Sequence, residues 1–167
     1  MPAEITLKDI HDIGQEIAND WKGDLTYFFG LEEEKNSGGE ASYPIFNIQF
    51  PVSRDLRYIN GSHDRRWDLV FELVNNTQTD ITKAEYAEML EVISDQLRAL
   101  VQRFITHYQD RGSINGKEIR FDVVSDVVYT PIIKATQETV IESGLRAAFS
   151  IRDEAHYGKC DIQDYFN

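Results

Sequence analysis

The hydrophobic pattern changes period within one continuous segment, residues 66–111. Its first part alternates between apolar and polar residues, which predicts a strand with one apolar face formed by Trp67, Leu69, Phe71 and Leu73. From Thr82 onward, apolar residues instead recur at steps of three and four, which predicts a helix of about seven turns. A strand that leads into so long a helix is typical of a small α+β domain.

The predicted long helix has start and stop signals of its own. Thr82 and Glu85 form a capping box, and Gly112 supplies the stop. Its apolar stripe consists of Tyr86, Leu90, Ile93, Leu97, Leu100, Phe104 and Tyr108. Three further apolar residues, Met89, Val92 and Val101, widen the stripe, which favours a helix packed on a sheet over a coiled-coil seam.

Further elements are predicted on both sides of this segment. The predicted helix over Thr6–Trp21 begins with a cap from Thr6 and Asp9, and it has to accommodate Gly14 through packing. The predicted strands are Leu25–Phe29, Tyr43–Val52 with Phe46, Ile48, Phe50 and Val52 on one face, Ile119–Val124, and Leu145–Ile151 opened by Gly144. Residues 125–142 show no clear period, and residues 31–42 are acidic and loop-like.

Together these elements predict a single α+β domain over residues 1–152. We expect a mixed, mainly antiparallel sheet packed on one long helix plus an N-terminal helix. The strong turn signal Asn60-Gly61 predicts a long hairpin that makes neighbours of Tyr43–Val52 and Trp67–Val74. Residues 153–167 are polar with late aromatic residues, and they predict an extended C-terminal arm.

Composition restricts the partners. The 167 residues carry a net charge of −12, which disfavours high-affinity binding to nucleic acid or to an anionic membrane surface and favours a basic protein partner. The single cysteine, Cys160, excludes an internal disulfide. The N-terminal residues lack a secretory signal, and no apolar run is long enough for a membrane span, so we expect a protein made in a cytosol and no contact with a membrane.

Candidate reactive groups do not assemble into a recognisable set. His156 and Cys160 have half of a metal-ligand spacing, and His63-Asp64 lies beside Arg65-Arg66 next to a predicted turn. The chain has no nucleotide-binding glycine loop and no nucleophile elbow. We therefore expect no enzymatic activity, no catalytic residues, no cofactor and no metal.

Two features favour assembly. Val70, Val74, Val124 and Ala148 interrupt the polar faces of the strands, so both sheet faces are expected to be partly covered, and two helices do not easily cover both. A neighbouring copy would cover the second face. In the C-terminal arm, Tyr157, Ile162, Tyr165 and Phe166 are large anchors of the kind that a docking segment uses.

The order of elements, ending in the strand Gly144-Leu145-Arg146-Ala147-Ala148-Phe149-Ser150-Ile151, resembles that of the tail terminator and tail-completion proteins of tailed bacteriophages. The resemblance implies a ring-forming structural protein of the virion, a head–tail connector or tail terminator without catalytic residues. It implies that sheet loops, the hairpin and the arm contact neighbouring subunits. The corresponding interface residues are Arg57, Tyr58, Arg65 and Arg66 near the hairpin and Tyr157, Ile162, Tyr165 and Phe166 in the arm.

The leading hypothesis is therefore a homo-oligomeric ring in a phage neck or tail, made in the bacterial host cytoplasm and incorporated into the virion. Its partners are further copies of itself, neighbouring neck or tail proteins, and DNA that passes without specific binding. The alternative is a cytosolic, non-catalytic α+β protein-binding module. A carboxylate-dependent hydrolase using Asp122 and Asp126 with His63 ranks third.

Overall fold

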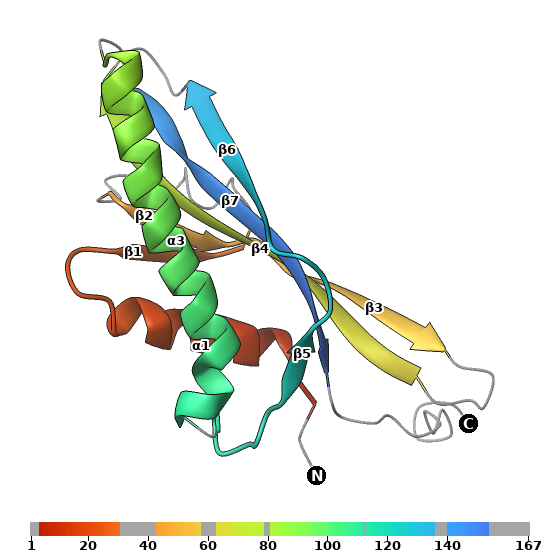
Figure 1. Ribbon diagram of the computed structural model, residues 1–167. Helices are drawn as coiled ribbons and strands as arrows, with labels where there is room; N and C mark the ends of the chain where they lie inside the picture. Colours follow the sequence, from red (N-terminus) through yellow and green to blue (C-terminus); the bar gives the residue numbers. More distant parts are fainter. Residues whose placement is uncertain are drawn as a thin grey trace.

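The computed structural model describes residues 4–30, 43–57, 63–78, 81–111, 113–135 and 140–153. Within them the chain forms two helices and a seven-stranded sheet (Figure 1). The helices are α1 (Leu7–Asn19) and α3 (Lys83–Arg111); the strands are β1 (Thr26–Phe29), β2 (Ile45–Ile48), β3 (Val52–Arg57), β4 (His63–Gln78), β5 (Phe121–Val123), β6 (Val128–Ala135) and β7 (Val140–Asp153). The predictions for residues 31–42, Asn60-Gly61, Gly112 and the arm after Asp153 lie outside the described residues.

The α+β class and the mixed, mainly antiparallel sheet are confirmed. The strand order is β1-β2-β4-β7-β5, with β3 on β4 and β6 on β7, and only β1 and β2 run parallel. The centre of the sheet is the long antiparallel pair of β4 and β7, which is in register from Arg66↔Arg152 to Gln78↔Val140. Both helices lie on the same face of this sheet (Figure 1).

The two predicted helix caps are confirmed. The Thr6 and Asp9 side chains accept each other's backbone N–H groups, and Thr82 and Glu85 do the same. Helix α1 ends at Asn19, two residues before the predicted Trp21. Gly14 is required by packing, because a Cβ there would lie 2.5 Å from the Tyr27 hydroxyl.

Helix α3 supplies the predicted stripe to the core. Ile93, Leu97, Leu100 and Phe104 are buried against the odd-numbered residues of β4 and β7. Aromatic rings connect the layers: the Phe71 ring lies 5.0 Å from that of Phe104 and 5.2 Å from that of Phe149. Tyr86 and Leu90, nearer the N-terminal end of α3, are only half-buried.

The prediction of one strand over Tyr43–Val52 is wrong at its C-terminal end. β2 and β3 pair with the same edge of β4, but the register shifts by one residue between Ile48↔Phe71 and Val52↔Asp68. This shift is the signature of a β-bulge between β2 and β3. The bulge includes Pro51, which has no N–H group to donate to the neighbouring strand. A shift of one residue reverses the face of every following side chain. Val52 therefore lies on the sheet face opposite Phe46 and is 55% exposed.

Two strands differ from their predicted bounds near the C-terminus. Residues 125–142, which showed no period, contain β6 and the start of β7. Pro131 is tolerated because β6, within the described part of the chain, pairs only with β7 and so forms an edge of the sheet. Gly144 does not open β7 but lies inside it, where a Cβ would come within 2.0 Å of the Leu73 carbonyl oxygen. The close approach of β4 and β7 at this point requires glycine.

Candidate functional site

The sheet face opposite the two helices, here called the open face, carries the most distinctive surface of the molecule. Even-numbered residues of β4 and β7 point to it, since their odd-numbered neighbours form the core beneath α1 and α3. At one end, Ile45, Val74 and Ile132 form a small second hydrophobic cluster with Phe28 and Tyr43. Toward the other end the face becomes exposed, and Val128 is 57% accessible. The described part of the chain contributes no helix to this face.

Three arginines form a row across the exposed end of the open face. Arg54 of β3 lies opposite Arg66 of β4, which lies opposite Arg152 of β7. We call these residues the arginine row. Like charges directly opposite one another destabilise a strand pair, so such a row calls for anionic partners.

Two carboxylates within the chain supply part of that charge. Asp68 binds Arg54 at 2.7 Å and accepts a hydrogen bond from Ser150 at 2.7 Å, and Asp122 binds Arg152 at 2.9 Å. Asp64, an even-numbered residue of β4, adds a third carboxylate to the same face, and the buried Nε of Arg66 has no hydrogen-bond partner.

A buried polar network occupies the middle of the open face. Glu72 is fully buried and accepts hydrogen bonds from Asn47 at 3.1 Å, from Gln49 at 2.9 Å and from two nitrogens of Arg146 at 2.6 and 3.0 Å. Asn47, Glu72 and Arg146 are register partners across β2, β4 and β7. Such a network fixes strand register, because any slip would leave a buried carboxylate without donors.

Hydrogen bonding also anchors the two ends of the sheet. At the apolar end, the Tyr43 hydroxyl donates to Glu142 at 2.6 Å, and burial together with this contact raises the pKa of Tyr43 to about 12. At the other end, buried Asp153 accepts the backbone N–H of Ile5 at 2.8 Å. β7 thus ends in a fixed contact at Asp153, from which the predicted C-terminal arm continues.

Asp9 fastens α1 to the turn before β5. Its buried carboxylate accepts hydrogen bonds from Lys117 at 2.7 Å and from the Thr6 backbone at 2.9 Å. Burial alone would raise the pKa of Asp9, but the hydrogen bonds from Lys117 and Thr6 outweigh it and hold the pKa below its usual value.

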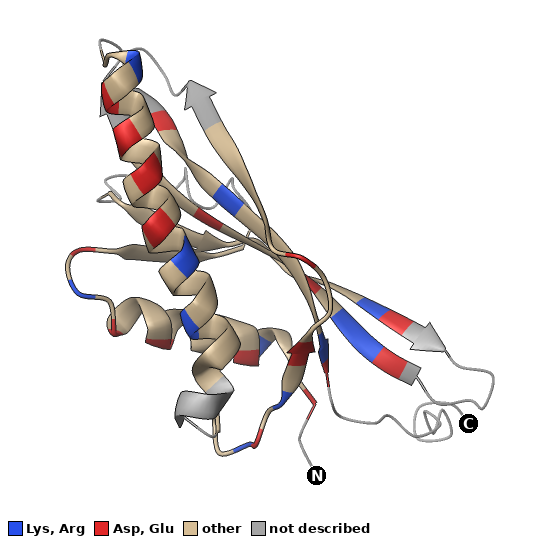
Figure 2. Ribbon diagram, in the orientation of Figure 1, with Lys and Arg blue, Asp and Glu red and all other residues tan. Residues whose placement is uncertain are grey.

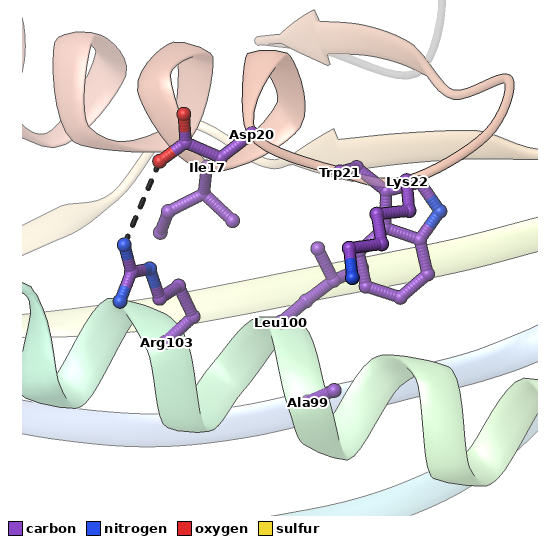
Figure 3. Close-up of a pocket in the computed structure, with 7 residues that line it drawn as sticks. All are labelled: Ile17, Asp20, Trp21, Lys22, Ala99, Leu100 and Arg103. Carbon is purple, nitrogen blue, oxygen red and sulfur yellow. Dashed lines mark ion pairs between the residues drawn. The ribbon is translucent and has the colours of Figure 1, made fainter.

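A groove lies between the two helices, on the side of the sheet opposite the open face (Figure 3). It has a volume of about 440 Å³ and lies between the C-terminal end of α1 and the middle of α3. Ile17, Trp21 and Leu100 make most of its wall apolar, while Arg103 binds Asp20 at 3.5 Å across one end. No pair of side chains in it has the spacing of a nucleophile and a base.

The sequence-predicted interface residues fall into separate groups. Arg65 and Arg66 are adjacent in β4 but face opposite sides of the sheet: Arg65 pairs with Glu4 and Asp55, and Arg66 joins the arginine row. Arg57 is the last residue of β3, opposite His63. Tyr58, Tyr157, Ile162, Tyr165 and Phe166 lie outside the described residues.

The residues considered for hydrolysis are not gathered into a site by the described residues. Asp122 is exposed and paired with Arg152, and Asp126 is exposed on the connection that follows β5. Among the described residues, no group of three His, Cys, Asp or Glu side chains has a metal-binding arrangement. His156 and Cys160 lie beyond those residues.

Sequence reasoning missed Arg54, Arg152 and the Glu72 network as features of one surface. Glu72 lay on a predicted strand, but Arg54 lay beyond the end of the predicted strand Tyr43–Val52, and the row depends on which strands are neighbours and on the bulge before β3.

Comparisons with known proteins do not assign the chain to a family. No protein-family model matches it, and no curated protein matches it. Among the described residues, neither helix is long and apolar enough to cross a membrane.

Proposed function

We propose that this protein is a non-catalytic structural subunit that closes into a homo-oligomeric ring in the neck or tail of a bacteriophage. The observation that carries the proposal is the exposed end of the open face: α1 and α3 cover the other face of the sheet, and this end presents arginines and exposed valines. A ring would bury this exposed end against the next copy.

The shape of the subunit supports this proposal. The β3–β4 hairpin extends beyond both helices, and the chain leaves β7 at the same end of the sheet (Figure 1). A projecting hairpin and a terminal segment of 14 residues, able to span up to about 50 Å when extended, would reach a neighbouring subunit or the next ring. The element order resembling tail terminator and tail-completion proteins points to the same role.

The charge of the chain also agrees with a ring around passing DNA. A net charge of −12 repels the phosphate backbone, so a channel lined by such subunits would let DNA slide without sticking. The arginine row and the carboxylates beside it would be covered between subunits in the ring and would not line the channel.

The test is to locate the chain in virions of the phage that encodes it. Quantitative mass spectrometry of purified particles should find a fixed number of copies per virion, and labelling should place them at the neck or along the tail. A chain found in infected cells but absent from particles would favour the alternative, a cytosolic binding module, for which the groove between α1 and α3 offers a ligand site.

A further inference from the structure

The groove between α1 and α3 combines an apolar wall with a cation at its rim. Leu100 is fully buried beneath it, and the half-buried ring of Trp21 stands at one end. Lys22 stands beside Trp21, whereas Arg103 and Asp20 pair with each other at the opposite end (Figure 3). Within the described part of the chain, Lys22 makes no ion pair. The groove therefore offers an apolar surface and an available ammonium group, which suit an aromatic segment with a carboxylate beside it.

The groove is also a basic place on an acidic chain. Of the described residues that line it, two are cations and one is a carboxylate, although the whole chain has a net charge of −12. Acidic residues mark the N-terminal half of α3, and basic residues mark its middle, beside the groove (Figure 2). An acidic segment of this chain would be repelled by much of the protein surface and attracted here.

The C-terminal arm, residues 154–167, has the complementary composition. It contains three carboxylates and one lysine, and the sequence Asp164-Tyr165-Phe166 places two large aromatic side chains directly after a carboxylate. Aromatic side chains bury much area for little lost conformational freedom, which makes them good anchors for a docking segment. The arm thus carries the chemical groups that the groove would bind.

The arm begins at a fixed place, within reach of the groove. Buried Asp153 accepts the backbone N–H of Ile5 just before α1, and the groove lies at the C-terminal end of α1. Because α1 has 13 residues, these two places are separated by about 20 Å along the helix. Tyr165 follows Asp153 by 12 residues, which span up to about 40 Å when extended. The arm is therefore long enough to turn back along its own subunit.

We propose that the arm folds back along α1 of its own chain and that Tyr165 and Phe166 dock in the groove, with Asp164 bound to Lys22. A short tether gives the arm an effective concentration of about millimolar at its own groove, which favours that groove over the groove of a second copy. The contact lies within one subunit and goes beyond the ring proposal. In an assembly that uses the arm between subunits, the groove would hold the arm until a neighbour displaces it.

Chemical linking in the full-length chain tests where the arm lies. Cys160→Ser with Gln163→Cys moves the only cysteine next to the docking residues, and Ala99→Cys adds a second thiol at the exposed rim of the groove. A short bismaleimide linker should then join the two thiols within one chain. The matched control replaces Ala99→Cys by Lys8→Cys, near the start of the arm, to which an undocked arm would link more often. We expect the groove position to link at least about 5-fold faster than the control.

Charge exchange identifies the partners in the contact. In the linking chain, Lys22→Glu or Asp164→Lys should each slow linking about 3- to 10-fold, because either change replaces attraction by repulsion. The two changes together should restore most of the rate. Tyr165→Ser with Phe166→Ser should slow linking by about 10-fold or more, since both aromatic anchors are lost. Lys83→Glu, a charge reversal at the far end of α3, should leave the rate unchanged.

Three outcomes would overturn the contact. Linking no faster at Ala99→Cys than at Lys8→Cys, or a charge exchange that fails to restore the rate, would show that the arm does not dock in the groove. Linked products with twice the mass of one chain on a denaturing gel would show that the groove takes the arm of a second copy. A small apolar anion found bound to the groove by native mass spectrometry would replace the arm as its occupant. None of these outcomes decides the ring proposal, which is tested by the mass of the full-length assembly.

Discussion

Leu97→Ala should destabilise the domain by about 3–4 kcal/mol. Leu97 is fully buried in the middle of α3, within the core cluster that includes Phe71 and Phe104. The substitution removes three carbon atoms, and at about 0.8 kcal/mol each the lost transfer free energy is about 2.4 kcal/mol. The remainder comes from the cavity, because the Phe71 and Phe104 rings, 5.0 Å apart, are fixed by both layers and can collapse only partly.

The assay is urea unfolding followed by circular dichroism, at one protein concentration because association itself raises apparent stability. A loss of 3–4 kcal/mol corresponds to a fall in Tm of about 6–16 °C for a chain of this size. Gln102→Ala, an exposed change on the same helix, is the control and should alter the free energy of unfolding by less than about 0.5 kcal/mol. If Leu97→Ala were as stable as this control, α3 would not pack on the sheet as described.

Three other changes test separate parts of the fold. Asp9→Asn should lower the free energy of unfolding by about 1–3 kcal/mol at pH 7. Because the pKa of Asp9 is lowered in the folded state, its carboxylate stabilises the fold above about pH 4, and this stabilisation is lost as the pH falls through the folded pKa. The free energy of unfolding should therefore depend less on pH in the acid range in the variant than in the wild type. Gly144→Ala should destabilise by more than the few tenths expected of a surface change, because its Cβ has to displace a strand backbone; an unchanged urea midpoint would contradict the close approach of β4 and β7. Arg146→Met should cost about 1–3 kcal/mol by leaving the Glu72 carboxylate short of donors, and Glu72→Met added to it should recover part of the loss in a double-mutant cycle.

Much of the architecture could be predicted because it is encoded locally. The period of three and four in α3, the capping boxes at Thr6 and Thr82, and the alternation in β4 each depend on residues close in sequence. Pairing of β2 with β4 followed from the hairpin signal and was confirmed. Local pattern also gave the correct direction for the buried side chains of β4 and β7.

The remaining features depend on relationships that no local pattern carries. The bulge before Val52 reverses the face of β3, and alternation alone could not reveal it. β6 showed no clear period because apolar residues lie on both of its faces: Tyr129 packs against the main core, whereas Val128 is exposed and Ile132 is buried in the second cluster on the opposite face. The arginine row requires both the bulge and the β4–β7 register, so its members were assigned only in part, through Arg66.

Asp153 also alters how the arm should be tested. It is buried and holds the Ile5 backbone, so a truncation that begins at residue 153 would damage the domain along with the arm. Removal of residues 154–167 is the cleaner change. It should leave a folded domain that assembles poorly or fails to join its neighbouring ring, and a shortened chain that assembles and joins normally would remove the arm from the interface.

The central claim is that the chain closes into a ring, and electron microscopy of the purified full-length protein, combined with mass measurement, tests it most directly. The proposal predicts closed particles of a single cyclic symmetry whose mass is an integral multiple, three or more, of the 19.3 kDa subunit. Isolated subunits of 19.3 kDa, or twofold dimers in which the same surface meets itself, would contradict it.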